Sequence, residues 1–362
     1  MPGVDLKVNG KIYRGWKSVR VERSIENVCG SFEIGTSERL LSNDWVSGFD
    51  EGLPVDVGNE CTLAVDGTPL VTGYVDDIAR EIDASAHAIS ISGRDKTGDL
   101  VDCSAVYGFG TFHNVDLPQI AQILLKPFKI GLFVNTDRGA WFRKIRIESG
   151  ESVFELLDRL ARHRGVLLTT DGRGNLVITR AGVGLSAEDA NLKLTRIETS
   201  LVLGENILSM RIERSQRDRY SEYTVKGQIP LNENITPVYN DTLKGVAKNE
   251  TIARYRPLVL VAEQPDYKSS FKLRAEWERN VREGRSTRIT VTVQGWQHAD
   301  GFWTPNRIVH LIAKPLGIEG GDLLIVSVTY TLDENGTRTE MSLTWPWAFD
   351  PLPTPEKEFR IP

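Results

Sequence analysis

The feature that most constrains this chain is a strongly marked helix at the start of the segment 151–180. Ser152 is a good helix-capping residue, and Glu155 three positions later completes a capping box. The apolar residues that follow share one helical face: Val153, Leu156, Leu157 and Leu160. Gly165 is a stop signal, preceded by cations where the helix dipole favours them. The sequence therefore predicts a helix that packs through one apolar side.

A β-hairpin follows this helix directly. The runs 166–170 and 176–180 are rich in β-forming residues, and the turn sequence Asp171-Gly-Arg-Gly-Asn175 lies between them. The whole unit lacks chemical groups in a catalytic pattern. It indicates a packing module.

The composition narrows the class of protein. A chain of 362 residues is long enough for two to four domains. The net charge of −5 disfavours tight non-specific binding of nucleic acid, which needs clustered cations. Three widely spaced cysteines, Cys29, Cys61 and Cys103, predict buried thiols rather than a disulfide or zinc framework. No secretory signal or membrane-spanning run is visible, so synthesis in a cytosol is expected.

The pattern of short strands predicts a β-rich region at residues 1–105. Its strands are separated by Gly, Asp, Asn and Pro, and Asp66-Gly67 is a hairpin signal. The spacing suits an antiparallel barrel or sandwich there, and a barrel is the expected form. Residues 106–182 change to an α/β pattern, with a capped helix after Asp116, a strand at 131–135 and then the helix-hairpin unit.

Strands return in the rest of the chain and predict a second antiparallel barrel. This barrel is expected from 183–230 and 285–345, with an irregular and helical insertion at 231–284. Long hairpins at 70–94 and 323–345 give the two β regions a similar pattern. The proline-rich end, 346–362, predicts an extended arm. The fold class is thus α+β, mostly β, with two antiparallel barrels flanking a small α/β domain.

No catalytic, cofactor-binding or metal-binding constellation is found. The motifs of hydrolases, zinc proteases, P-loops and dinucleotide sites are absent, and no two histidines have metal-ligand spacing. Carboxylates cluster in the pair Asp76-Asp77 and at Asp95, Asp99 and Asp102, where solvated loops are the simpler explanation. We therefore predict that the chain is not an enzyme and carries no cofactor.

Two runs of basic residues have to be weighed against a nucleic-acid groove. They are Lys7, Lys11, Arg14, Lys17, Arg20 and Arg23, and Arg211, Arg214, Arg217 and Arg219. Acidic residues interrupt both runs, and strand alternation would divide each run over two faces. Salt-bridged strand surfaces or contacts between protomers are favoured.

Aromatic residues close to the proline-rich end are the candidate interface residues. Trp345, Trp347 and Phe349 lie in or beside the predicted arm, where burial within the same chain is less available. Aromatic anchors are typical of protein interfaces.

Several segments taken together resemble the phage baseplate hub family of the Mu type, also known as the tail protein P family. This family is related to late control protein D and to the hubs of T-even phages. The residues that carry the resemblance are 151–180, 274–286, 291–296, 301–306, 330–337 and 341–344. Their order is more specific than any single segment.

The resemblance implies a structural late protein of a contractile tail. It implies a hollow homotrimer whose two barrels per chain form a ring with pseudo-sixfold symmetry. Such a hub adapts the sixfold tail tube to the threefold membrane-piercing spike, and lets the tape-measure protein and then DNA pass, without specific nucleic-acid binding or membrane insertion. The implied partners are other copies of the chain, the spike, the tube and other baseplate proteins. The implied location is the virion baseplate, after assembly in the host cytoplasm.

Two other functions stay open at this point. One is a hub component of a type VI secretion spike, which would ordinarily continue into a long repeat-containing spike. The other is a baseplate-associated cell-wall hydrolase, which would need two close carboxylates in a cleft.

Overall fold

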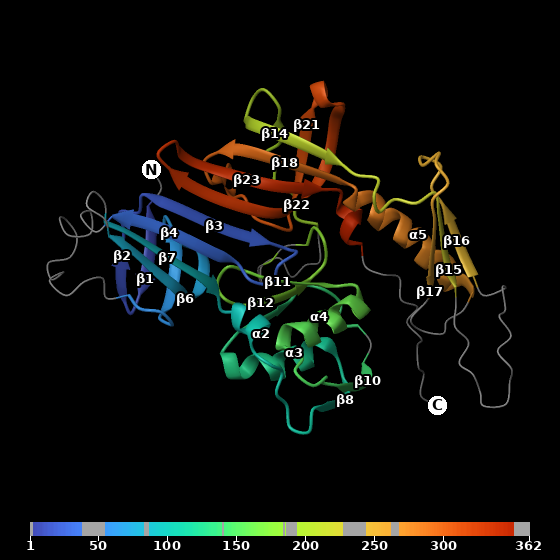
Figure 1. Cartoon of the computed structure of the whole chain (residues 1–362), viewed down its shortest axis with the longest axis horizontal. Helices are drawn as coiled ribbons and strands as arrows, with labels where there is room; N and C mark the ends of the chain where they lie inside the picture. Colours follow the sequence, from blue (N-terminus) through green and yellow to red (C-terminus); the bar gives the residue numbers. More distant parts are fainter. Residues whose placement is uncertain are drawn as a thin grey trace.

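One large antiparallel sheet organises most of the chain (Figure 1). The computed structural model describes residues 3–37, 55–82, 87–139, 141–183, 185, 194–226, 244–261 and 268–350. A helical unit lies against one side of the sheet, and a small sheet with a long helix lies at one end of the molecule (Figure 1). The fold is mostly β, as predicted.

The N-terminal part of the large sheet contains seven strands. They are β1 (Val4–Val8), β2 (Lys11–Tyr13), β3 (Ser18–Ser24), β4 (Ser31–Ser37), β5 (Glu60–Val65), β6 (Thr68–Ile82) and β7 (His87–Asp95). The predicted turn at Asp66-Gly67 joins β5 to β6, with positive φ angles of 48° and 82°. Two consecutive left-handed residues match the twist of a tight hairpin, which explains the Asp-Gly sequence.

The C-terminal part of the sheet uses strands that are far apart in the sequence. They are β13 (Leu201–Val202), β14 (Ile207–Arg214), β18 (Thr287–Gln294), β21 (Ile308–Ala313), β22 (Ile318–Asp333) and β23 (Gly336–Thr344). A short hairpin, β19 (Gln297–His298) and β20 (Gly301–Phe302), follows β18. The long hairpin of β22 and β23 agrees with the predicted one.

The two β regions are not separate. β3 pairs antiparallel with β22, with Val21 opposite Tyr330, so that thirteen of the described strands make one sheet. Buried residues from both regions share one core, among them Leu63 and Met341. Within the described ranges the strand order runs from β14 to β2 without closing, so no closed barrel is present there. Most strands of this sheet pair antiparallel, as predicted, although β13 pairs parallel with β21. The pairing of β3 with β22 was not predicted, because hydrophobic alternation does not specify a partner 300 residues away.

The α/β unit is built as the sequence indicates, with additions. Its elements are α2 (Gly98–Asp102), β8 (Thr111–Val115), α3 (Leu117–Leu125), η2 (Lys126–Phe128), β9 (Leu132–Val134), β10 (Phe142–Arg146), α4 (Val153–Arg164), β11 (Leu167–Thr170) and β12 (Leu176–Thr179). The capping box of α4 is present: Glu155 N–H donates to Ser152 Oγ at 3.2 Å, and Ser152 N–H donates to Glu155 Oε2 at 2.7 Å. Gly165 ends α4 at φ 63°. The β8–β10 pair was not predicted.

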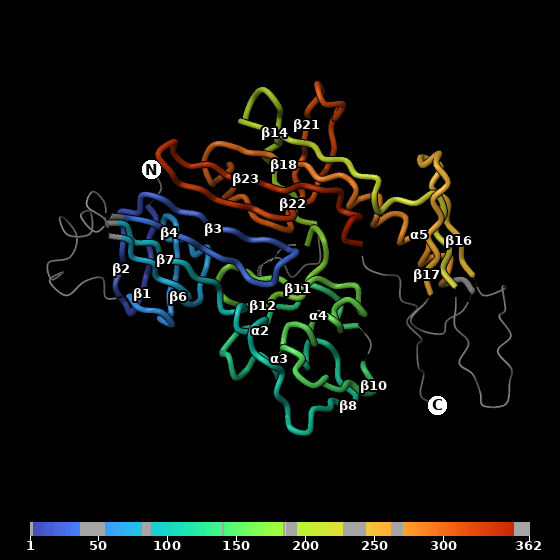
Figure 2. The backbone as a smooth tube through the Cα atoms, viewed as in Figure 1, coloured from blue at the N-terminus to red at the C-terminus, as the bar shows by residue number. Residues whose placement is uncertain are grey.

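The insertion differs from the prediction. β15 (Glu222–Lys226), β16 (Lys244–Lys248) and β17 (Pro257–Val261) form a separate sheet, and α5 (Lys268–Arg285) packs on it. The prediction that placed residues up to 230 in the second barrel is therefore wrong for β15, and the irregular segment contains two strands. Figure 2 shows the chain leaving β14, forming this sheet and returning along α5. Tyr223 and Phe271 are buried where α5 packs on this sheet, and no local sequence pattern reveals that contact.

The end of the chain is also different from the predicted extended arm. Pro346–Phe349 form a short 3-10 helix, η5, that packs on α5. Proline is compatible with the first turn of a helix, where its missing N–H is not needed. The remainder of the predicted arm, 351–362, lies outside the described residues.

Candidate functional site

The three predicted interface residues lie in and just before η5. The rings of Trp345 and Trp347 stack with centroids 4.8 Å apart and planes 9° from parallel. Trp345 is half-buried over Gly321, whereas Trp347 keeps 39% of its surface exposed. The pair therefore presents one indole at the surface, backed by a second that is anchored on the large sheet.

Helix α5 holds η5 in place through its last turns. The Trp277 indole N–H donates to the carbonyl of Asp350 at 2.8 Å, and Arg285 Nε donates to the carbonyl of Ala348 at 3.1 Å. Ala348 is fully buried against Gly284, whose missing side chain lets the two backbones approach closely. The aromatic residues are thus held by a rigid helix.

Phe349 points back into the molecule. It packs against a small buried cluster at the junction of the two β regions, made of Ile25, Ile308, Leu324 and Val326. The guanidinium of Arg285 lies 5.8 Å from the Phe349 ring centroid, within reach of a cation–π contact. Phe349 is therefore partly buried by residues of its own chain, and Trp347 is the most exposed of the three aromatic residues.

A groove of about 890 Å³ lies beside these residues. Its walls are β10 and α4 on one side, and α5 and η5 on the other, with Phe142, His163, Trp277 and Phe349 among its lining residues. The sequence did not indicate this groove, because its walls come from segments more than 100 residues apart. Only the aromatic composition of 345–349 could have pointed to one wall.

The groove combines aromatic and charged side chains. Two of its arginines are paired within their own helices: Arg162 contacts Asp158 at 2.6 Å on α4, and Arg274 contacts Glu278 at 2.9 Å on α5. Burial raises the pKa of the Asp350 carboxyl at the rim. Aromatic residues and arginine are enriched at protein interfaces.

The carboxylate cluster of the sequence is brought together around one arginine. Arg94 bridges Asp76 and Asp102, each at 2.7 Å. Asp95 is buried and accepts hydrogen bonds from Gly30 N–H at 2.8 Å and Thr97 N–H at 3.0 Å, while its burial raises its pKa. Arg94, Asp95 and Asp102 thus hold the junction between β7 and α2.

The histidines and basic runs are placed much as expected. His310 Nδ1 lies 2.6 Å from Asp322 Oδ1. The His298 ring packs against Trp303 with the two planes tilted by 58°, and burial lowers the His298 pKa. Several cations of the two basic runs form ion pairs at strand surfaces, as predicted: Arg14 with Asp5, Arg20 with Glu22, and Arg211 with Glu213. Arg219, in a loop, pairs instead with Glu283 of α5. Arg23 is an exception, because it is buried.

The described part of the chain has neither a cluster of metal ligands nor a membrane-spanning helix. No group of three or more His, Cys, Asp and Glu side chains there could hold a metal ion. No helix in those ranges has the length and apolar character needed to cross a membrane.

Three family models match successive parts of the chain. Residues 3–95 match the N-terminal domain of the Mu phage baseplate assembly protein GpP-like family. Residues 97–180 match the second domain of the baseplate hub protein gp44-like family, and 268–352 match the fourth domain of Mu phage baseplate assembly protein GpP.

Whole-chain comparisons give the same family. The chain is 35% identical to baseplate hub protein gp44 of Escherichia phage Mu over 94% of its length and 87% of that protein. It is similar to the 43 kDa tail protein of prophage MuSo2 from Shewanella oneidensis, with 37% identity, a TM-score of 0.82, and coverage of 96% of this chain and 99% of that one. A tail protein from Neisseria meningitidis shares the fold, with 24% identity, a TM-score of 0.76, and coverage of 96% and 98% of the two chains.

Proposed function

This chain belongs to the family of Mu-like phage baseplate hub proteins, and from that membership we propose that it is the trimeric adapter of a contractile tail. Three copies surround a channel, match the sixfold tail tube on one side and carry the threefold spike on the other. The observation that carries the proposal is the identity of 35% to the Mu hub along nearly the whole chain.

The architecture supports an adapter with two β units per chain. The β3–β22 pairing and the shared core fix the two β regions relative to each other within one chain. A trimer of such chains presents six β units with little freedom between neighbours, as a pseudo-sixfold ring requires. We propose that each β unit closes into a barrel only in the assembled ring.

We divide the chain into units along the boundaries of its helices and strands. The first β unit covers 1–105, and the α/β unit covers 106–182. The second β unit uses 183–214 and 286–345, and the insertion with its own small sheet covers 215–285. The segment 346–362 closes the chain, beginning with η5 on α5.

The channel of the trimer is proposed as part of the genome-ejection conduit. The chain is weakly acidic, with a net charge of −5, and a cationic lumen would retain DNA by releasing its counterions. Neutral or acidic side chains should therefore line the channel. A lumen dominated by Lys and Arg would refute this part of the proposal.

We assign the partners on the same basis. They are two further copies of the chain, the spike, the tube and other baseplate proteins, and the tape-measure protein during assembly in the host cytoplasm. Trp345, Trp347 and Phe349 are proposed as part of a protein interface, with Trp347 as the exposed anchor. A role in type VI secretion is the alternative with a related architecture, and the Mu-type identity favours the phage tail. We propose no catalytic role.

Light scattering of the purified protein tests the assembly state. The proposal predicts three copies of the 40.4 kDa chain per particle, either in the protein alone or in its complex with the spike, whose mass is then added. A stable monomer in both samples would count decisively against the adapter.

A further inference from the structure

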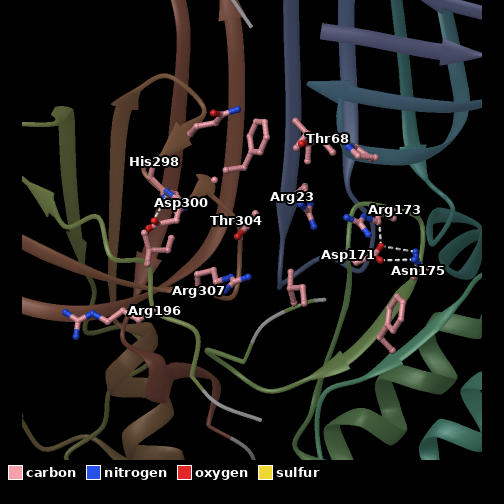
Figure 3. Close-up of a pocket in the computed structure, with 18 of the residues that line it drawn as sticks. Arg23, Thr68, Asp171, Arg173, Asn175, Arg196, His298, Asp300, Thr304 and Arg307 are labelled. Atoms are coloured by element: carbon pink, nitrogen blue, oxygen red, sulfur yellow. Dashed lines mark hydrogen bonds and ion pairs between the residues drawn. The ribbon is translucent and has the colours of Figure 1, made fainter. Parts of the chain in front are cut away.

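A second cavity, of about 850 Å³, lies where the two β regions meet the turn of the β11–β12 hairpin. Figure 3 shows the residues that line it, with the second β region on one side and β3 and the hairpin turn on the other. The aromatic groove near η5 is lined by other residues. The family resemblance gives no role to this space.

Arg23 on β3 is the unusual residue of the cavity. Its side chain lines the cavity although the residue is only 5% exposed. Nη2 donates to the carbonyl of Thr170 at 3.2 Å, but Nε has no hydrogen-bond partner in the structure. Among the described residues, Arg23 makes no ion pair. A buried guanidinium with one carbonyl acceptor is strongly under-compensated.

The carboxylates near Arg23 have other partners. Both oxygens of Asp95 accept backbone N–H groups, from Gly30 and Thr97. Asp171 holds its own turn together, because Oδ1 accepts the N–H of Arg173 at 2.7 Å and Oδ2 accepts from the Asn175 amide at 2.7 Å. Among the described residues, neither carboxylate forms an ion pair with Arg23, so no direct contact neutralises its guanidinium.

Two further arginines face the same space from different elements. In Figure 3 the side chain of Arg173 extends from the hairpin turn towards Arg23, and Arg307 extends towards them from the second β region. Thr68 and Thr304 add hydroxyl groups to the lining. A fourth arginine, Arg196, is held outside this group by Asp322 at 3.1 Å.

The other titratable residues of the lining do not change the net positive charge at the end of the cavity that holds Arg23 and Arg173. Glu198 and Asp300 lie on the wall formed by the second β region. His298 Nδ1 accepts the N–H of Asp300 at 3.2 Å, and burial lowers the His298 pKa, so this ring adds no positive charge near neutral pH. The cationic end is therefore the one formed by β3 and the hairpin turn, which Arg307 faces.

We propose that this cavity binds a small oxyanion through the guanidinium groups of Arg23, Arg173 and Arg307. Guanidinium recognises phosphate and carboxylate through the same paired N–H geometry, so both chemistries fit. The bound anion supplies the charge that buried Arg23 lacks. Because the three arginines come from β3, the α/β hairpin and the second β region, the anion also ties these three parts together.

The test is binding of two probes, inorganic phosphate and succinate, to the full chain by calorimetry and by thermal unfolding at constant ionic strength. We expect saturable binding and a rise in melting temperature with at least one probe. Binding of phosphate alone assigns a phosphate-type ligand, and binding of succinate alone assigns a carboxylate. Binding of neither probe overturns the proposal.

Two variants separate this site from general salt effects. Arg173→Gln alters an exposed turn residue and should raise the dissociation constant about tenfold, the equivalent of one charge-assisted hydrogen bond of roughly 1.4 kcal/mol. Arg23→Met should abolish the ligand-dependent rise in melting temperature. Without ligand it should be no less stable than the parent, because it removes a buried charge that lacks a partner.

The matched control is Arg211→Gln, an exposed arginine on β14 that is paired with Glu213 and does not line the cavity. It should bind the probe as the parent does. If Arg173→Gln and Arg211→Gln bind with the same affinity as the parent, the arginine site is wrong. If Arg23→Met does not fold, Arg173→Gln decides the question by itself.

Discussion

The contact between α5 and η5 offers the sharpest test of how the C-terminal aromatic residues are held. Gly284 lies within α5, and a Cβ atom added there would come within 2.8 Å of the backbone N, Cα and Cβ of Ala348. Carbon atoms pack at about 3.5–4.0 Å, so Gly284→Ala must push η5 away by roughly 1 Å. The backbone atoms of Ala348 cannot rotate out of the way.

The expected cost follows from what this displacement loosens. The hydrogen bonds from Trp277 to Asp350 and from Arg285 to Ala348 are each worth about 1 kcal/mol. Overpacking a buried contact costs about 1–3 kcal/mol, whereas alanine gains about 1 kcal/mol over glycine in a helix. We therefore predict that Gly284→Ala lowers the free energy of unfolding by about 1–3 kcal/mol, by chemical denaturation. The near-ultraviolet circular dichroism of the stacked Trp345 and Trp347 should also change.

Gly98→Ala is the matched control. Gly98 lies in the short helix α2, and an added Cβ would meet its neighbours at an ordinary contact distance of 3.4 Å or more. This variant should be as stable as the parent, or more stable. If Gly284→Ala is likewise neutral or stabilising and leaves the tryptophan signal unchanged, the close packing of η5 on α5 is wrong.

Four further predictions concern the helix cap, the reactivity of the thiols, the pH dependence of stability, and the exposed indole. Ser152→Ala removes the acceptor of the α4 capping box and should cost about 1 kcal/mol in denaturant unfolding, and an unchanged midpoint would contradict it. A thiol reagent at pH 8 should modify exposed Cys103 quickly and Cys61 only on unfolding, since burial raises the Cys61 pKa to about 12; equal rates would refute this. Because the unfolded Cys61 thiol loses its proton first, stability should fall as the pH rises above the ordinary cysteine pKa of 9.0, whereas stability that stays level would contradict this. Trp347→Ala should weaken spike binding or trimer formation more than it lowers the unfolding midpoint, and the reverse result would assign Trp347 to the core.

Local signals in the sequence predicted the local structure well. The capping boxes at Asp116 and Ser152, the glycine at 165 and the Asp66-Gly67 turn all act over a few residues, and each has the expected geometry. In these places the side chain that specifies the structure is next to the backbone that it controls. The order of the family segments was likewise sufficient to predict the family, which the comparisons confirm.

Long-range pairing was where the predictions failed. The junction of β3 with β22, the sheet of β15 with β17, and the packing of η5 on α5 each depend on a partner that alternation and capping do not identify. The candidate site shows the same limit. Trp345, Trp347 and Phe349 were found by composition, but the opposite wall of their groove on α4 and β10 was not. Arg23 was predicted to be part of a salt-bridged surface, and only the fold places it in a cavity.

We propose that this chain forms a hollow threefold hub between the tail tube and the spike. Electron cryo-microscopy of the protein assembled with its tail tube and spike tests it most directly. The account predicts three copies around a continuous channel, with six β units facing the tube and neutral or acidic side chains along the lumen. A different number of copies, or a ring without a channel, would contradict it.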